Sequence, residues 1–221
     1  MELRLVGSEM CIRDRLHLYQ FGLQEELLFV EGRLSPWTYK NITSVAFKAN
    51  EPLWARRFVE DYKEKLAPKF AENAYAYNKA YLHFHNNQFD QALQLLNQVE
   101  FTDVFYSLDS KTLLIKIYYE LGEDEAMLFA IDAFRTYLRR NREISDYMRT
   151  IYLNLMRFLR RLSVIEPYEK IKLEALYQKI QIAENVADIE WLLKKVKQKT
   201  RPAAARPVSY THLRAHETQF H

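Results

Sequence analysis

The amino-acid sequence predicts an all-α protein built of helical hairpins that stack on one another. Glycine is scarce, at 4 of 221 residues, which disfavours the glycine-rich turns of sheet proteins. Apolar residues make up 48% of the chain and recur at helical spacing. Asn50, Asn87 and Gly122 interrupt this pattern at intervals of 37 and 35 residues. Asn and Gly best tolerate the left-handed backbone with which one helix ends before the next begins, so these intervals indicate a repeat.

Both ends of the chain differ from the body. Residues 5–15 (LVGSEMCIRDR) and 207–218 (PVSYTHLRAHET) resemble translated sequencing-adapter sequence fused to a genuine reading frame. From this resemblance we expect residues 1–15 to be artefactual, and disordered or ill-placed, and residues 201–221 to be a disordered, largely artefactual tail. The native chain would then extend further in both directions. The residues of these ends that are suited to metal binding are Cys11, His212, His216 and His221. His212 and His216 have the H-x-x-x-H spacing, but the chain has a single cysteine and therefore no C-x-x-C pair to complete a structural zinc site. We therefore expect no metal or redox site.

The first helix of the body is expected at residues 16–31, and we interpret residues 16–34 as the last helix of a repeat truncated upstream. Ser35-Pro36 then supplies an N-cap and a proline at the first helical position, which is typical of a helix start. Pro52 indicates the start of the following helix in the same way. Residues 35–140 are therefore predicted to form three helical hairpins.

The hairpins align over residues 39–68, 77–101 and 112–138, with a core stripe on each helix. In the first helices the stripe is expected at Val45, Phe47, Leu82, Phe84, Ile117 and Tyr119. In the second helices, behind a small residue, it is expected at Ala55, Phe58, Val59, Tyr62, Ala92, Leu95, Leu96, Val99, Ala126, Phe129, Ala130 and Ala133. The acidic run Glu123-Asp124-Glu125 lies at a helix N-terminus, where the helix dipole favours negative charge without any catalytic role.

Helical hairpins of this length, with a turn residue, an alanine and a closing proline at Pro68, resemble the tetratricopeptide repeat family. The resemblance covers residues 37–140. It implies a right-handed superhelix of αα-hairpins that binds a peptide or protein on its concave face. The Trp of the family pattern is absent, and its close-packed glycine is replaced by Thr43, Ala80 and Ile115. The body is also similar to uncharacterised bacterial repeat proteins, which implies no activity.

The first helices would line the concave face. The residues expected there by register are Lys40, Ser44, Lys48, Tyr77, Tyr81, His85, Thr112, Lys116 and Glu120. Some members of the family hold a peptide's terminal carboxylate with Lys and Asn, and Lys40 and Asn78 match that motif. Ser44, Asp109 and Leu113 depart from it, since Ser44 stands for an Asn and the other two stand for basic residues. The alternative is that these residues form an ordinary half-exposed helix surface.

The C-terminal part, residues 141–200, is predicted to cap the stack. Helices are expected at residues 143–163, after Pro167 as far as Asn185, and at 189–196, with fraying from Lys197. Net charge indicates no partner, because residues 16–205 contain 27 basic and 25 acidic residues. The basic residues nevertheless gather between positions 135 and 161. They are Arg135, Arg139, Arg140, Arg142, Arg149, Arg157, Arg160 and Arg161. This basic patch is a solvated helix surface, a docking site for an acidic protein surface, or a phosphate-binding surface.

These features favour a non-catalytic protein-interaction scaffold without a cofactor. The alternatives are a nucleic-acid-binding repeat that uses the basic patch, and an α-helical enzyme whose site is not local in sequence. No phosphate loop, nucleophile elbow or H-E-x-x-H motif is present. His83 and His85 lie two residues apart on one helix and point in different directions, so they cannot share a metal ion. The single cysteine and the lack of a signal peptide predict a cytoplasmic protein. The lack of a long apolar run predicts that it does not insert into a membrane. The sequence does not indicate an oligomeric state.

Overall fold

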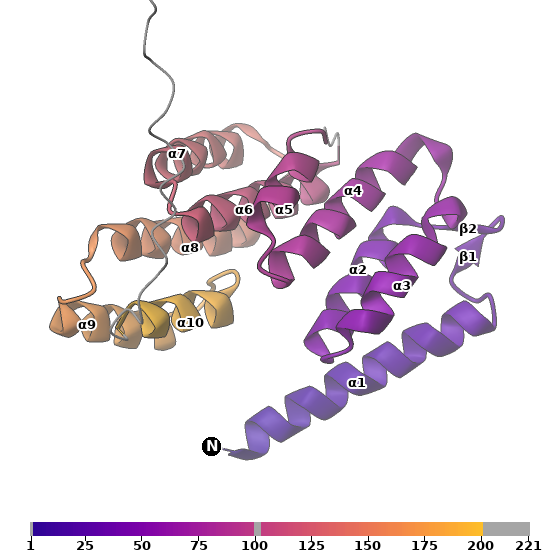
Figure 1. Cartoon of the computed structure of the whole chain (residues 1–221), viewed down its shortest axis with the longest axis horizontal. Helices are drawn as coiled ribbons and strands as arrows, with labels where there is room; N and C mark the ends of the chain where they lie inside the picture. Colours follow the sequence, from indigo (N-terminus) through magenta and orange to yellow (C-terminus); the bar gives the residue numbers. More distant parts are fainter. Residues whose placement is uncertain (1, 100–102, 201–221) are drawn as a thin grey trace, which may run out of the picture. The chain divides into compact units, whose positions relative to one another are not determined.

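The computed structural model describes the backbone of residues 2–99 and 103–200, and the side chains of residues 12–99 and 103–200. Within this part, the chain is all-helical apart from two short strands, and successive helices contact one another within residues 2–144 and within residues 145–200 (Figure 1). The chain divides into two compact units, Met1–Ile144 and Ser145–His221. The prediction of an all-α fold is confirmed. The sequence expectations for residues 201–221 and for the side chain of Cys11 lie outside the described residues.

Unit 1 contains three pairs of helices behind an N-terminal helix. Its helices are α1 (Glu2–Gln24), α2 (Pro36–Lys48), α3 (Pro52–Asp61), the short 3-10 helix η1 (Lys63–Lys65), α4 (Pro68–His85), α5 (Phe89–Leu96), α6 (Val104–Leu121) and α7 (Asp124–Arg140). Ser35 caps α2 as predicted, because its Oγ accepts a hydrogen bond of 3.0 Å from the backbone N–H of Thr38. Pro52 occupies the first position of α3, also as predicted.

The segment after α1 differs from the prediction of a helix over residues 16–31. The helix ends at Gln24, and β1 (Phe29–Val30) pairs with β2 (Arg33–Leu34) as an antiparallel hairpin. Leu28 folds back onto Gly22, where an added Cβ would lie 2.9 Å from its Cγ, so a side chain at position 22 would displace the side chain of Leu28. The guanidinium of Arg33 donates to the carbonyls of Glu64 and Leu66 at 2.9 and 3.2 Å and ties the strand pair to the first hairpin.

The three turns between paired helices have the same geometry. Asn50, Asn87 and Gly122 adopt φ angles of 62°, 58° and 77°, which confirms the predicted left-handed positions. In each turn the following N–H donates five residues back. These bonds are Glu51 to Ala46 at 2.9 Å, Gln88 to His83 at 2.9 Å and Glu123 to Tyr118 at 3.0 Å. This is the Schellman pattern, which satisfies carbonyls at the end of the first helix of each pair.

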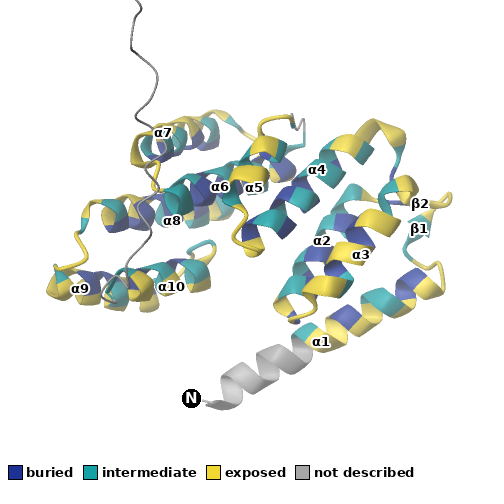
Figure 2. Cartoon of the chain, in the orientation of Figure 1, coloured by how far each residue is buried: buried dark blue, intermediate teal, exposed yellow. Residues whose placement is uncertain are grey.

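The core follows the predicted stripe in the first two hairpins and departs from it in the third (Figure 2). Ala55 and Ala92 are fully buried, five residues after their turns. The prediction for α7 is wrong: Phe129 is 80% exposed, and Ala133 is also exposed. The buried residues of α7 are Met127, Ile131, Phe134 and Leu138. Met127 lies five residues after Gly122, so the spacing from the turn sets the register, and the alanine at position 126 does not.

Unit 2 contains α8 (Asp146–Val164), α9 (Lys170–Gln181) and α10 (Ile189–Thr200) around a core of leucine, isoleucine and valine side chains. The fully buried members are Leu155, Leu159, Leu162, Leu173, Ile180, Leu192 and Val196. The second helix of this unit was predicted to reach Asn185, but α9 ends four residues earlier, at Gln181; Asn185 lies in the following loop with a φ of 55°. Fraying from Lys197 is not observed as far as Thr200. The ammonium of Lys199 donates to the carbonyls of Leu162 and Ser163 at 2.9 and 3.2 Å, which holds the end of α10 against the end of α8.

Candidate partner-binding site

The first helices of the three hairpins, α2, α4 and α6, carry the residues that the sequence predicts for partner binding. α4 contacts both α2 and α6. We define the α2/α4/α6 face as the polar and aromatic residues that these helices present together. Its members are Trp37, Lys40, Ser44, Phe47, Lys48, Tyr77, Asn78, Tyr81, His85, Phe105, Tyr106, Asp109, Lys116 and Glu120.

One end of this face is closed by contacts within the chain. The ammonium of Lys40 forms an ion pair with the carboxylate of Asp109, which is 69 residues further along the sequence. The same ammonium lies 4.7 Å from the centre of the Trp37 ring and 5.3 Å from that of Tyr106. The side chain of Lys40 is only 14% exposed. Lys40 therefore has an anionic partner and two aromatic neighbours before any ligand binds.

Aromatic side chains surround this ion pair. The ring of Trp37 contacts Phe105 edge to face at 5.2 Å and Tyr106 at 5.5 Å, and Tyr77 contacts Tyr106 at 5.4 Å. The hydroxyl of Tyr106 donates to the carbonyl of Pro36 at 2.5 Å. Burial raises the pKa of the Tyr106 phenol above its ordinary value, so Tyr106 remains a neutral donor. These contacts join the start of α6 to the start of α2, and we call them the end cluster.

The two residues that match the family's carboxylate-binding motif are engaged differently. Lys40 is paired with Asp109, as described above. Asn78 is 1% exposed, and its Nδ2 donates to the carbonyl of Ala74 at 2.7 Å. Its Oδ1 is buried and has no hydrogen-bond partner among residues 12–99 and 103–200. In this arrangement the carboxylate of Asp109 is already paired with the Lys40 ammonium, to which a peptide carboxylate would have to bind.

The opposite end of the face is open and aromatic. His85 stacks on Phe47 at 4.7 Å and lies 4.4 Å from Tyr81, while Phe47 contacts Tyr81 edge to face at 5.7 Å. We call these three residues the aromatic cluster. His85 is exposed, and Phe47 and Tyr81 are half-buried. Ser44, half-buried, and Lys48, exposed, lie on α2 beside Phe47. Such a surface can contact apolar or proline side chains and also offer a hydrogen bond from imidazole or phenol.

Three of the remaining predicted residues lie mostly inside the unit. Tyr77 and Thr112 are buried, and the hydroxyl of Thr112 donates to the carbonyl of Leu108 at 2.8 Å. Lys116 is 8% exposed, with its ammonium 5.1 Å from the centre of the Phe84 ring. Glu120 is half-buried. The structure thus brings Tyr81 and His85 together, places Lys40 at the far end, and leaves little of Tyr77 and Lys116 for a partner to contact.

Trp37, Phe47, Phe105 and Tyr106 were not among the residues predicted for the site. A signal for two of them is present in the sequence. Trp37 lies three residues before Lys40, and Phe47 lies three residues after Ser44. Residues at this spacing share one side of a helix. Phe105 and Tyr106 are brought to the site by the position of α6, which no local pattern specifies.

Six of the eight arginines of the predicted basic patch are exposed, and they belong to different units. Arg139 and Arg140 end α7, and Arg142 follows in the same unit. Arg157, Arg160 and Arg161 lie on α8 in unit 2. Two further arginines have acidic partners three residues away, at 3.3 Å for Arg135 and Asp132 and at 2.5 Å for Arg149 and Asp146. Each unit therefore carries three of these exposed arginines.

The described part of the chain offers no set of side chains arranged to bind a metal ion. Residues 12–99 and 103–200 contain no group of three or more His, Cys, Asp or Glu side chains placed to hold an ion. His83 hydrogen-bonds the Oε1 of Gln88 at 2.8 Å, while His85 belongs to the aromatic cluster, so the two histidines have separate environments. None of the helices in that same part is both long enough and apolar enough to cross a bilayer.

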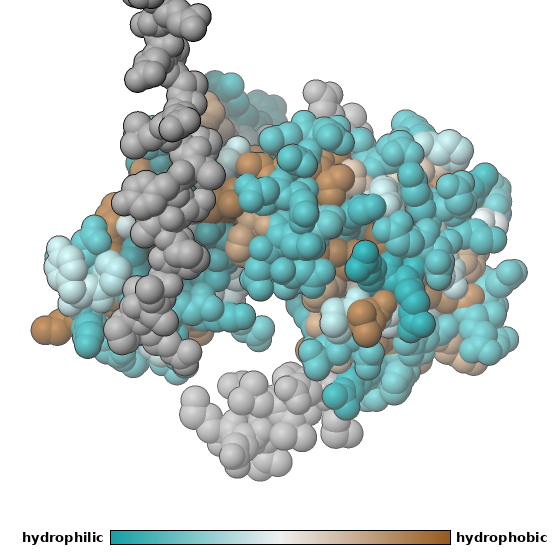
Figure 3. All heavy atoms as spheres, viewed as in Figure 1, coloured by the Kyte–Doolittle hydropathy of each residue, from teal (hydrophilic) through white to brown (hydrophobic). Residues whose placement is uncertain are grey.

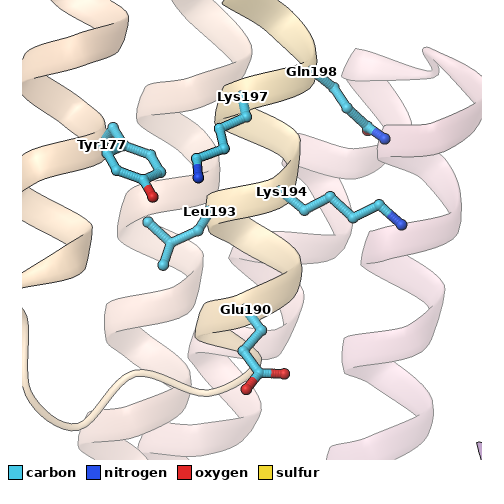
Figure 4. Close-up of a pocket in the computed structure, with 6 residues that line it drawn as sticks. All are labelled: Tyr177, Glu190, Leu193, Lys194, Lys197 and Gln198. Carbon is cyan, nitrogen blue, oxygen red and sulfur yellow. The ribbon is translucent and has the colours of Figure 1, made fainter. Parts of the chain in front are cut away.

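Unit 2 has a pocket of about 410 Å³ beside α9 and α10 (Figure 4). Its lining residues are Tyr177, Glu190, Leu193, Lys194, Lys197 and Gln198. Lys197 faces Tyr177 with its ammonium 4.9 Å from the ring centre, while Lys194 and Gln198 extend away from it (Figure 4). The side chains do not converge on one point as the groups of a catalytic site do.

Comparisons with known proteins add no family to this description. No family model, no curated protein and no solved structure matches the chain. The class of the protein is therefore given by its own structure, as an all-α protein of sequential helical hairpins.

Proposed function

We propose that the protein is a non-catalytic interaction scaffold of the tetratricopeptide-like type. In this proposal unit 1 is a right-handed superhelix of three hairpins, and its α2/α4/α6 face is concave and binds a peptide or protein segment. The identical turns at Asn50, Asn87 and Gly122 support this arrangement, because equivalent turns give equivalent hairpins that stack in the same way. Side chains with binding chemistry on the first helices also support it.

The observation that carries the proposal is the aromatic cluster of Phe47, Tyr81 and His85. Aromatic side chains that remain accessible beside polar residues are typical of protein-binding surfaces. Lys48 next to them is exposed and has no ion-pair partner among the described residues. We therefore infer that the partner segment places apolar or proline side chains on the aromatic cluster and a carboxylate near Lys48. The end cluster would close the groove beyond it.

A capture experiment with matched variants tests the proposal. Wild-type protein, a Tyr81→Ala/His85→Ala variant and a Tyr147→Ala control are immobilised, and bound proteins are identified by mass spectrometry. Tyr147 is 63% exposed in unit 2, so its variant controls for loss of an exposed tyrosine. We expect wild type and control to capture the same protein partners after nuclease treatment, and the double variant to lose them while its circular dichroism spectrum is unchanged.

Two outcomes of this experiment contradict the proposal. Capture that disappears after nuclease treatment and falls steeply with salt indicates a nucleic-acid-binding protein that uses the arginines. Capture that persists in the double variant shows that the aromatic cluster is not the binding surface. For any partner identified, titration of its isolated segment against wild type and the double variant then measures the change in affinity.

A further inference from the structure

Large apolar side chains that are exposed to solvent gather in two short stretches. Of the 13 such residues in the described chain, seven lie within residues 16–32 and 157–172. The first group is Leu18, Phe21, Leu27 and Val30, with exposures of 70%, 56%, 69% and 75%. The second is Val164, Tyr168 and Ile171, with exposures of 69%, 79% and 88%. Single exposed apolar residues are ordinary on a protein surface, but groups of them mark interaction sites.

The first group, which we call the N-terminal patch, consists of Leu18 and Phe21 on the exposed side of α1 and of Leu27 and Val30 in the segment that follows this helix. Leu16 and Leu23 of α1 are buried, at 3% and 6% exposed. At about 100° per residue, Leu18 and Phe21 project from the opposite side of the same helix. Residues 15–33 contain Glu25, Glu26 and Glu31 against Arg15 and Arg33, a net charge of −1, and Arg33 donates to the carbonyls of Glu64 and Leu66. All three glutamates are exposed.

The second group, which we call the C-terminal patch, lies in unit 2 where α8 gives way to α9. Figure 3 shows hydrophobic surface protruding at the start of α9. Arg157, Arg161 and Val164 share the exposed side of α8, because they are spaced by four and three residues. Residues 157–172 contain five basic and two acidic residues, and one of the acids, Glu169, is paired with Lys172. Arg157 and Arg161 form no ion pair among the described residues.

We propose that the protein associates with a second copy of itself head to tail, with the N-terminal patch of one chain bound to the C-terminal patch of the next. Each patch combines apolar anchors with a net charge, which is negative for the N-terminal patch and positive for the C-terminal patch. A contact between two N-terminal patches, or between two C-terminal patches, would bring like charges together and is disfavoured. A contact between unlike patches pairs Glu25 and Glu26 with arginines of α8 while it covers both apolar groups. Such a heterologous contact leaves one patch of each kind free, so further copies can add to form rings or open chains.

Sedimentation velocity of the full chain over a range of concentrations tests this association. We expect dimers and longer species that increase with concentration and decrease with added salt, because salt screens the charges. A Leu18→Ser/Phe21→Ser variant removes one patch, and a Val164→Ser/Ile171→Ser variant removes the other. Each is expected to raise the apparent dissociation constant by about tenfold or more, since a few anchors dominate most interfaces. Phe129→Ser, at a lone residue 80% exposed, serves as the control and leaves association unchanged.

Mixing the two double variants distinguishes head-to-tail contact from any symmetric one. Each variant retains the patch that the other lacks, so an equimolar mixture is expected to form a 1:1 dimer and nothing larger. Wild-type protein that remains monomeric at all concentrations overturns the proposal, and so does a mixture that stays monomeric while the wild type associates. The substitutions avoid the α2/α4/α6 face. Failure here therefore leaves the proposed partner binding untouched, and loss of partner capture leaves self-association untouched.

Discussion

At the scale of single residues, the turn at Gly122 depends on backbone conformation alone. Its φ is 77°, and an added Cβ would meet no atom within 4 Å, so a substitution there is resisted by backbone strain and not by packing. Gly122→Val is expected to lower the free energy of unfolding by about 1–2 kcal/mol. Gly122→Asn is the matched control and is expected to cost only a few tenths, because Asn50 and Asn87 occupy the equivalent turns.

Urea denaturation of the wild type and the two Gly122 variants measures this difference. A Val variant as stable as the wild type would contradict the left-handed conformation at this position. Equal losses of stability in the Val and Asn variants would show that any side chain at position 122 destabilises the protein. The open space around Gly122 does not predict this result.

In the two-residue turn between β1 and β2, a substitution is expected to stabilise the protein. Glu31 and Gly32 have φ angles of 52° and 70°, the positive values of a type I′ turn. Glutamate is strained in this region, whereas asparagine visits it readily. Glu31→Asn is therefore expected to raise the free energy of unfolding by about 0.5–1 kcal/mol, and Glu31→Gln is expected to leave it unchanged. A thermal melt that ranks the Asn variant at or below the Gln variant would contradict this assignment.

Turn residues could be predicted from the sequence where the residue type itself favours positive φ. Contacts between residues far apart in the chain could not be predicted. Asn50, Asn87 and Gly122 were identified from sequence because few residues favour positive φ. Glu31 has the same backbone geometry but carries no such signal. The ion pair of Lys40 and Asp109 joins helices that are separated by a whole hairpin, so its formation depends on how the hairpins stack.

At the scale of elements, the register of α7 can be tested with two phenylalanines on the same helix. Phe134 is 1% exposed and Phe129 is 80% exposed. Phe134→Ala is expected to destabilise the protein by about 3–5 kcal/mol, because it removes a buried ring and leaves a cavity. Phe129→Ala is expected to change stability by no more than about 0.5 kcal/mol. Chemical denaturation of both variants measures the difference, and similar losses would show that α7 is rotated from the orientation described.

Two elements were predicted incorrectly because their local patterns are ambiguous. In α7 the alanine at 126 mimics the small residue of the earlier hairpins, but a constant spacing of five residues from the turn selects Met127. After α1, the run LLFV at residues 27–30 fits either a helix stripe or a strand, and short apolar runs do not distinguish the two. Helices with clear caps and longer periodic stretches, such as α2 and α8, begin close to where the sequence places them.

At the scale of the whole molecule, the candidate site forms because the helical hairpins of unit 1 stack on one another. Its residues come from three helices spread over residues 36–121, and the sequence identified those that share one register on each helix. The sequence could not show that α6 reaches α2 at one end of the face. That contact turns Lys40 from an available cation into half of an ion pair, and it leaves the aromatic cluster as the accessible part of the site.

Buried tyrosines in unit 1 predict how the stability of the protein depends on pH. Tyr39 is fully buried, and its hydroxyl donates to the carbonyl of Val59 at 2.5 Å. Burial, with a smaller contribution from nearby Tyr75 and Glu60, raises the pKa of Tyr39 above its ordinary value of 10.0. Burial likewise raises the pKa of Tyr106. Below about pH 10 both phenols are protonated in the folded and unfolded states, so their contribution to stability is constant. Above it the unfolded chain loses these protons while the folded protein keeps them.

The free energy of unfolding is therefore expected to fall as pH rises beyond about 10, by up to about 1.4 kcal/mol per pH unit for each buried tyrosine. Urea titrations between pH 7 and 11 measure this slope. In a Tyr39→Phe/Tyr106→Phe variant the slope is expected to flatten, although the stability at pH 7 falls because two hydrogen bonds are lost. Tyr168→Phe, at a residue 79% exposed, is expected to keep the wild-type slope. An undiminished slope in the double variant would mean that other groups govern alkaline unfolding, and that the hydroxyls of Tyr39 and Tyr106 are more accessible to water than their positions in unit 1 imply.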